Sequence, residues 1–296
     1  MAVEKLPHNF LALEPEFSDQ QTARFAVLPI PYDATTSYRA GSRDGPQAII
    51  TASQQLELFD EELGAEFHKQ GIATLDPLEP NAAGPEAMQE DIYQAARRIV
   101  RRGKFLLGLG GEHSVSVGLI RAVAARHRKL SVLQIDAHLD LRDAYQQTPY
   151  SHACAMRRIL PIVERLVPVG IRCVSLEEHR FLRKSGIRPV TARQCAESDD
   201  WLDAAVDGLG ERVYVSVDID GFDPAVAPAT GTPEPGGLDW YQVTSLLRAV
   251  AAERQIVAAD VVEVLPAPGQ VTTEYLAARL AYKIMCYVQA AESESL

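Results

Sequence analysis

The chain has 296 residues, with 29 Lys and Arg against 40 Asp and Glu, so its formal net charge is −11. This acidic balance argues against a protein that follows nucleic-acid phosphates, because such a protein carries a basic face. An acidic chain suits a cationic small molecule or a metal ion instead. No apolar run reaches the roughly 18 residues of a membrane span, and the first residues lack the pattern of a signal peptide. We therefore expect neither a nucleic-acid partner nor a membrane partner.

Short apolar runs alternate with helical patterns along the whole chain. Several runs are continuously apolar, as expected for a parallel sheet that is covered on both faces. The expected strands are Phe25–Leu28, Ile72–Leu75, Phe105–Leu109, Leu130–Ile135, Leu166–Ile171, Ile187–Val190, Val213–Ile219 and Ile256–Val262. The expected helices are Pro85–Arg102, a helix that begins at Ser114 as its N-cap, Asp239–Ala252 and Thr272–Val288.

Repeated alternation of strand and helix predicts either a doubly wound αβα sandwich or a (β/α)₈ barrel, and periodicity does not separate the two. No linker rich in Gly, Ser or Pro interrupts the pattern, so we expect a single domain over residues 1–296. The four cysteines are scattered and form no Cys-x-x-Cys pair. That usage indicates reduced thiols and a cytoplasmic protein rather than a disulfide framework.

Three potential metal ligands follow the expected strand Leu130–Ile135. Asp136, His138 and Asp140 occupy alternate positions, so their side chains share one face of an extended chain. The carboxyl end of a strand is where open α/β sheets and barrels hold their sites. A single Asp-x-His is more often a solvated strand end, so this motif needs support from elsewhere in the chain.

Two further strands supply that support. Asp218 and Asp220 end the run that starts at Val213, and His113 follows Phe105–Leu109 after two glycines. An unpaired carboxylate inside an apolar run is costly, and carboxylates packed together repel one another unless cations lie among them. Two divalent ions would neutralise four carboxylates and leave a bound hydroxide as a nucleophile. The sequence therefore predicts a binuclear metal site.

The ligand types indicate which metal to expect. Oxygen ligands with a minority of imidazole suit Mn²⁺, and the lack of a nearby cysteine in the motifs argues against a thiolate zinc site. Zn²⁺, Ni²⁺ and Co²⁺ are alternatives to Mn²⁺ that the ligand types do not exclude. We expect the pair Gly110 and Gly111 to let the backbone turn sharply, so that His113 faces the site. The same segment is no dinucleotide loop, because His113 stands where the third glycine belongs.

Three ordered segments, Gly110–Ser114 (GGEHS), Asp136–Asp140 (DAHLD) and Ser216–Pro224 (SVDIDGFDP), resemble the three signatures of the ureohydrolases, the family of arginase and agmatinase. The resemblance extends to Gly41–Pro46 and Asp260–Val264. It implies an arginase-like fold, which is a three-layer αβα sandwich on a mainly parallel eight-stranded sheet. It also implies two Mn²⁺ per chain and a homo-oligomer, either a trimer or a hexamer.

The resemblance also implies roles for single residues. One ion would be held by His113, Asp136, Asp140 and Asp218, and the other by Asp136, His138, Asp218 and Asp220. A hydroxide that bridges the ions would attack the guanidinium carbon, with Asp140 holding it in line. His152 stands where the family carries a histidine that passes a proton to the leaving amine, and Glu263 stands where a carboxylate pairs with the guanidinium.

The segment Gly231–Leu238 (GTPEPGGL) resembles the agmatinase form of the loop after the third signature. The resemblance therefore implies an agmatinase-type hydrolase of linear amidine C–N bonds that converts agmatine, a small cationic guanidino compound, to putrescine and urea. Aminopropylagmatine, a guanidino acid and arginine are alternative substrates. A dinuclear phosphoesterase and a non-enzymatic metal-binding relative are more distant alternatives. We expect residues 141–150 to form much of the far end of the pocket, with Asp143 near the distal ammonium and Arg142 either pointing outward or paired with an acidic neighbour.

Overall fold

The structure, a computed structural model, describes residues 7–294. Its centre is an eight-stranded sheet with the order β4-β1-β5-β10-β9-β6-β7-β8, in which every neighbouring pair is parallel. A separate antiparallel ribbon consists of β2 and β3. The strands are β1 Phe25–Ile30, β2 Phe59–Asp60, β3 Ala65–Glu66, β4 Ile72–Thr74, β5 Phe105–Gly110, β6 Leu130–Ile135, β7 Arg165–Ile171, β8 Val190–Thr191, β9 Arg212–Asp218 and β10 Gln255–Val262.

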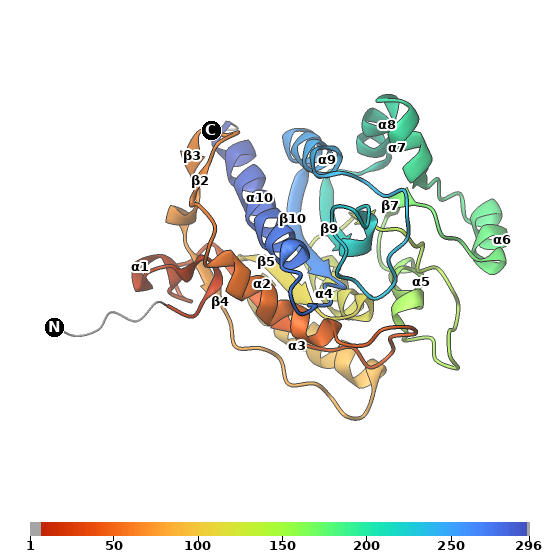
Figure 1. Ribbon diagram of the computed structural model, residues 1–296, viewed down its shortest axis with the longest axis horizontal. Helices are drawn as coiled ribbons and strands as arrows, with labels where there is room; N and C mark the ends of the chain where they lie inside the picture. Colours follow the sequence, from red (N-terminus) through yellow and green to blue (C-terminus); the bar gives the residue numbers. More distant parts are fainter. Residues whose placement is uncertain (1–6, 295–296) are drawn as a thin grey trace.

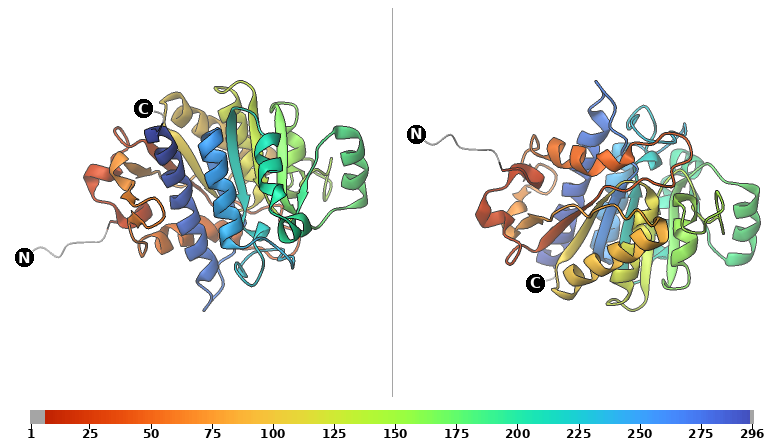
Figure 2. Two further views of the ribbon diagram at one scale, coloured as in Figure 1. Left: turned by 90° about the horizontal axis from the view of Figure 1, so that it is seen from above. Right: turned by 90° about the horizontal axis from the view of Figure 1, so that it is seen from below.

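Helices cover both faces of this sheet, so the predicted three-layer αβα sandwich is confirmed and the barrel is excluded (Figures 1 and 2). The helices are α1 Pro15–Ser18, α2 Gly45–Ser53, α3 Pro85–Arg101, α4 Ser116–Ala124, α5 Ala155–Ile159, α6 Leu176–Ser185, α7 Ala192–Glu197, α8 Asp200–Gly208, α9 Trp240–Glu253 and α10 Thr272–Glu294. Residues of α2, α7, α8, α9 and α10 belong to one apolar core, and residues of α3, α4 and α5 belong to the other.

The strands divide their side chains between the two cores. Along β5, Phe105, Leu107 and Leu109 lie in the core beneath α9 and α10, whereas Leu106 lies in the core beneath α3 and α4. Burial of one such leucine contributes about 1.5–3 kcal/mol to the free energy of unfolding. This two-sided burial is the reason why the strands are continuous apolar runs in the sequence.

The prediction of eight strands is confirmed, but some boundaries differ. β8 has only two residues, because it is an edge strand that pairs with β7 at Val169 and Ile171 alone. The expected helix start at Ser114 is wrong. The chain first forms a 3₁₀ turn, η4 His113–Val115, and the Ser114 hydroxyl donates to the carboxylate of Glu112 instead of capping α4. The short helices α2 and α5 to α8 were not expected.

The strand order decides where the site lies. β9 and β10 come late in the chain, yet they insert between β5 and β6 in the middle of the sheet. The carboxyl ends of β5, β10, β9 and β6 therefore meet at one edge of the sheet, which is the edge where open α/β sheets bind ligands.

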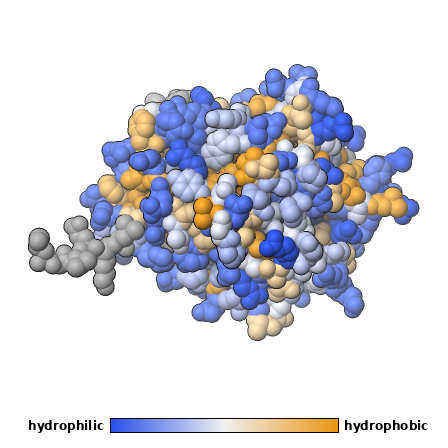
Figure 3. Space-filling model, viewed as in Figure 1, coloured by the Kyte–Doolittle hydropathy of each residue, from blue (hydrophilic) through white to orange (hydrophobic). Residues whose placement is uncertain are grey.

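A membrane span requires a helix of sufficient length and apolar character. Within residues 7–294, no helix has both the length and the apolar character needed to cross a membrane. Figure 3 shows hydrophilic residues over most of one face, with apolar residues gathered in a strip near its middle.

Candidate active site

The first group of predicted ligands converges on His113, in the turn η4 after β5. Its Nδ1 lies 3.1 Å from Asp136 Oδ2, 3.0 Å from Asp140 Oδ2 and 3.4 Å from Asp218 Oδ2. All four side chains are buried. Three carboxylates surround this Nδ1, yet among the described residues none forms a well-aligned hydrogen bond with it. A buried nitrogen that faces carboxylate oxygens without such a bond suits a shared metal ion.

The second group lies beside the first and shares Asp136 with it. His138 Nδ1 lies 3.0 Å from Asp220 Oδ2 and 3.7 Å from Asp136 Oδ1. Each of the sets His113, Asp136, Asp140 and Asp136, His138, Asp220 brings three ligand atoms within 4.8 Å of one another, the spacing that a bound ion needs. The structure thus brings together all six residues that the sequence suggested as ligands.

Backbone amides hold the carboxylates in place. Asp136 Oδ1 accepts from the N–H of His138 at 2.6 Å, and Asp218 Oδ1 accepts from the N–H of Asp220 at 2.9 Å. Asp220 Oδ1 accepts from the N–H of Ala137 at 3.0 Å, which links the loops after β6 and β9. In each carboxylate the other oxygen, Oδ2, faces a histidine. Asp136 and Asp218 face His113, and Asp220 faces His138.

The electrostatics of the cluster favour positive charge. Burial alone would lower the pKa of His113, but the surrounding carboxylates of Asp136, Asp140 and Asp218 raise it well above its usual value. Burial, together with the neighbouring charges of Asp220 and Asp136, raises the pKa of Asp218 well above the usual range. Burial and the Asp136 charge raise the pKa of Asp140 to about 6. Such a cluster has a strong preference for cations, as expected for a centre that binds divalent metal.

A second buried carboxylate orients His113 from behind. Ser216 Oγ donates to Asp260 Oδ1 at 2.8 Å, and it lies 2.9 Å from His113 Nε2. Tyr214 donates to the other oxygen of Asp260 at 2.6 Å. Because the one proton of Ser216 goes to Asp260, its oxygen accepts the Nε2 proton of His113. When the ring is neutral, as in a histidine that binds a metal, this bond leaves the Nδ1 lone pair facing the carboxylates.

The sequence motifs did not indicate this chain of contacts from Asp260 through Ser216 to His113. Its signal was present in the sequence, since Ser216 and Asp260 are polar residues inside two otherwise apolar strands. Their contact depends on the register between β9 and β10, where Asp260 lies opposite Ser216. Such a register between two strands so far apart in the sequence was not predictable.

Two site residues have strained backbones. Asp140 has φ 52° and Glu263 has φ 65°, a left-handed conformation that residues other than glycine rarely adopt. The Glu263 carboxylate accepts from the N–H of His113 at 2.7 Å, and Glu263 lines the cavity. Strain of this kind costs about 1–3 kcal/mol and persists where the surrounding structure imposes it. Both side chains are thereby turned toward the site.

The glycines before His113 are required for space rather than for a positive φ. A Cβ on Gly111 would lie 2.1 Å from the Tyr32 carbonyl oxygen, and one on Gly110 would lie 2.5 Å from Val115 Cγ2. Neither glycine has a positive φ. The chain does bend at Gly111 and Glu112, as expected, and the glycines are needed there because β5 and η4 pack closely against their neighbours.

His152 lines the same cavity as Glu263 and lies at the start of the turn η5 His152–Cys154. Its backbone N–H donates to Thr35 Oγ1 at 3.0 Å, and its Nδ1 lies 3.3 Å from the same hydroxyl. Burial lowers the pKa of His152 to about 4, so the ring is neutral near pH 7. The structure thus brings His152 to the cavity as a neutral imidazole that can accept a proton.

Thr35 and Glu112 are two further site residues that the sequence analysis missed. The Glu112 carboxylate is fully buried and accepts from both the N–H of Thr35, at 2.6 Å, and its hydroxyl, at 2.7 Å. Because Thr35 in turn contacts His152, Glu112 anchors the segment that positions this histidine.

A cavity of about 200 Å³ opens onto the cluster. It is lined by Asp140, Asp218 and Asp220 at its inner end, and by Tyr145, Glu178 and Arg142 among others farther out. The carboxylate of Glu178, which lines the cavity, accepts from the N–H groups of Leu141 and Ser175, both at 3.0 Å.

Two expectations for the far end of the pocket are wrong. Asp143 does not face the cavity, because its largely exposed carboxylate is bound to Arg158 at 2.6 Å. Arg142 does not point outward. Its guanidinium stacks over the ring of Tyr145, 4.9 Å from the centroid, and both residues line the cavity. Cation–π stacking favours this inward position, since the ring attracts the guanidinium.

Comparisons with known proteins place this site in a family context. The family model described as the arginase family matches residues 23–287. The chain is 39% identical over 289 residues to the N(1)-aminopropylagmatine ureohydrolase of Synechocystis sp., covering 95% of this chain and 94% of that protein. It is 41% identical over 262 residues to the protein of the same name from Thermus thermophilus, covering 88% and 89%. The solved structure of agmatine ureohydrolase from Thermoplasma volcanium superposes with a TM-score of 0.86 at 32% identity, covering 93% of each chain.

Proposed function

The chain belongs to the arginase family as an agmatinase-type ureohydrolase, a hydrolase of guanidino C–N bonds, and on this basis we propose that it uses two Mn²⁺ to release urea from aminopropylagmatine. The substrate assignment rests on two relatives named N(1)-aminopropylagmatine ureohydrolase. They match this chain over most of their length, at 39% and 41% identity. Agmatine, the substrate first suggested by the sequence, is the runner-up. It shares the guanidinium end and lacks only the aminopropyl extension.

The metal assignment follows the two ligand groups. His113, Asp136, Asp140 and Asp218 would hold one ion, and Asp136, His138, Asp218 and Asp220 would hold the other. Such ions, when bound, supply Lewis acidity and acidify water for attack on carbon. The oxygen-rich donor set supports Mn²⁺ as the metal.

The remaining roles fall to side chains of the cavity. Glu263 would pair with the substrate guanidinium, because a carboxylate and a guanidinium match as a planar fork and its carboxylate faces the cavity from a buried position. Asp140 would hold the attacking water in line. His152, neutral at pH 7, would carry a proton to the leaving amine, a step worth about 10²–10⁴-fold in rate.

Two residues of the cavity wall favour different substrates: Glu178 favours a cationic substrate and Arg142 an acidic one. Glu178 would attract the ammonium groups of a polyamine tail, and its hydrogen bonds come from the neutral Leu141 and Ser175. Arg142 also lines the cavity and would attract a carboxylate. This position of Arg142 makes a guanidino acid, such as 4-guanidinobutyrate, the third candidate substrate after agmatine.

Urea release from a substrate panel tests the proposal. We expect kcat/KM with Mn²⁺ to fall in the order aminopropylagmatine, agmatine, 4-guanidinobutyrate, arginine. We expect arginine last because its α-carboxylate lies beside its α-ammonium and is therefore placed differently from that of 4-guanidinobutyrate. An α-carboxylate that Arg142 does not pair would cost about 1–3 kcal/mol, which is roughly a tenfold to hundredfold loss. If 4-guanidinobutyrate comes first, and Arg142→Gln removes that preference, the acidic substrate replaces the polyamine. Urea release from none of the four compounds would contradict the proposed reaction.

We further propose that residues 1–296 act as one ureohydrolase domain, since the family match runs through nearly the whole chain. A trimeric or hexameric assembly and a cytoplasmic location stay predictions. Size-exclusion chromatography with light scattering would test the assembly.

A further inference from the structure

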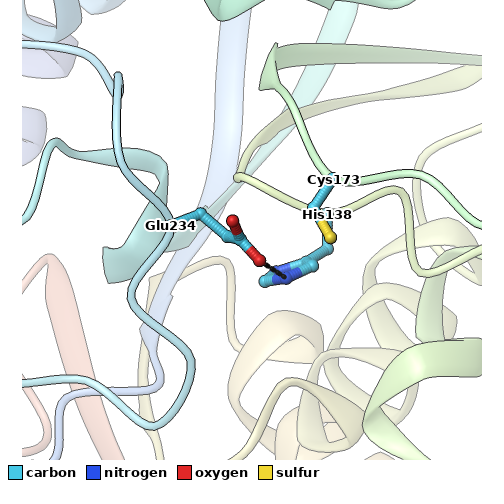
Figure 4. A group of neighbouring side chains, drawn as sticks. All are labelled: His138, Cys173 and Glu234. Carbon is cyan, nitrogen blue, oxygen red and sulfur yellow. Dashed lines mark ion pairs between the residues drawn. The ribbon is translucent and has the colours of Figure 1, made fainter.

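A third group of metal-binding side chains lies on the outer side of His138. The thiol of Cys173 and the carboxylate of Glu234 come from two different loops and both approach the ring of His138 (Figure 4). Glu234 Oε1 lies 3.9 Å from His138 Nε2, and the three potential ligand atoms all lie within 4.8 Å of one another. The sequence analysis expected no cysteine near the metal motifs. The structure corrects that expectation.

Backbone contacts hold this group together. His138 and Cys173 form a parallel bridge, and the N–H of Cys173 donates to the Ala137 carbonyl at 3.0 Å. The guanidinium of Arg172, the residue before Cys173, donates to the carbonyl of Glu234 at 2.7 Å and to that of Pro235 at 3.1 Å. The loop that carries Glu234 is therefore tied to the strand end that carries Cys173.

The group is also accessible. His138, Cys173 and Glu234 are all half-buried, whereas the other three cysteines are buried. His138 and Cys173 line the cavity, so an ion can reach them from its mouth. The three side chains thus form a small, preorganised pocket with an open side.

We propose that His138, Cys173 and Glu234 form a second site for a thiophilic divalent cation, Zn²⁺ in particular, and that this site shares His138 with the catalytic cluster. Thiolate, imidazole and carboxylate are the ligands that zinc takes in proteins, and three protein ligands leave a fourth position for water. A thiolate donor selects zinc over manganese, which prefers oxygen. On binding, a Zn–S bond forms and the Cys173 thiol releases its proton to the solvent.

Zinc at this site inhibits the enzyme, and this consequence alone rests on the proposed function. A neutral imidazole has one proton and one lone pair. When Nε2 binds zinc, the proton lies on Nδ1, where Asp220 Oδ2 accepts it at a distance of 3.0 Å. His138 then no longer offers its Nδ1 lone pair to the ion that it shares with Asp136 and Asp220.

Cobalt substitution tests the site without relying on activity. The protein is freed of metal with EDTA and titrated with Co²⁺, and near-ultraviolet absorption from thiolate-to-cobalt charge transfer is recorded. None of the catalytic ligands is a thiol, so only a site that contains Cys173 gives this band. The wild type is expected to show this band and Cys173→Ser to lose it. Equilibrium dialysis against Zn²⁺ should show one zinc fewer per chain in Cys173→Ser, and at least tenfold weaker zinc binding in Glu234→Gln. Cys195→Ser and Glu177→Gln serve as controls, because Cys195 lies in the core and Glu177 is exposed elsewhere on the surface.

The outcomes separate this site from the proposed function. Absence of the band in the wild type, or its persistence in Cys173→Ser with an unchanged melting curve, overturns the site whatever the enzyme hydrolyses. If the band depends on Cys173 but Zn²⁺ inhibits wild type and Cys173→Ser equally, the site stands and the inhibition through His138 is overturned.

Discussion

The hydrogen bonds behind His113 give a quantitative prediction for Ser216→Ala. The substitution removes one oxygen atom and two buried hydrogen bonds, one of 2.9 Å to His113 Nε2 and one of 2.8 Å to Asp260. Both partners are then left short of one bond in a buried environment. Each unsatisfied group costs about 1–3 kcal/mol. We therefore expect the metal-free protein to lose roughly 2–6 kcal/mol in its free energy of unfolding.

The same substitution should weaken metal binding. Without Ser216, no acceptor fixes the Nε2 proton of His113, so the ring is free to place its proton on Nδ1, where the metal would bind. Loss of such an orienting partner typically costs 10–100-fold in metal affinity, about 1.4–2.7 kcal/mol. Urea denaturation of the EDTA-treated protein measures the first effect, and Mn²⁺ titration measures the second.

Ser131→Ala is the matched control. Ser131 is also a fully buried serine on a sheet strand, but its hydroxyl accepts from the N–H of Gly210, away from the metal ligands. This variant should lose stability and keep its Mn²⁺ affinity. If Ser216→Ala binds Mn²⁺ as tightly as the wild type, or if both serine variants weaken binding equally, the orienting role of Ser216 is refuted.

The geometry of the site supports four further predictions. Asp136→Asn should leave fewer than two Mn²⁺ per chain by metal analysis, because Asp136 belongs to both ligand groups, and full metal content would contradict its shared role. Chelation of the wild type should lower Tm by at least about 5 °C in calorimetry, since ions bound at 100 times their Kd add about 2.7 kcal/mol. His152→Ala should lower kcat by about 10²–10⁴-fold with two Mn²⁺ retained, and a change in KM alone would make His152 a substrate contact. Gly111→Ala should destabilise the fold by several kcal/mol in urea denaturation, because its Cβ would lie 2.1 Å from a carbonyl oxygen, and a near-wild-type midpoint would contradict this packing.

The sequence alone determined the parts of this protein that depend on local pattern. Continuous apolar runs indicated the eight strands of the sheet because burial on both faces leaves few polar positions in a strand. The positions of Asp136, His138 and Asp140 directly after such a run indicated three ligands at a strand end, although β6 ends at Ile135 and Asp140 has a left-handed rather than an extended backbone. In each case the physical cause acts over a few neighbouring residues, and it can therefore be recognised in the order of the letters.

Only the tertiary structure decided what distant segments do to one another. The insertion of β9 and β10 between β5 and β6 brings Asp218 and Glu263 beside His113, and the β9–β10 register sets Ser216 against Asp260. The same long-range packing turns Arg142 inward onto Tyr145 and brings Cys173 to His138. Strand order, register and loop packing minimise the free energy of the whole chain, so no local sequence pattern specifies them.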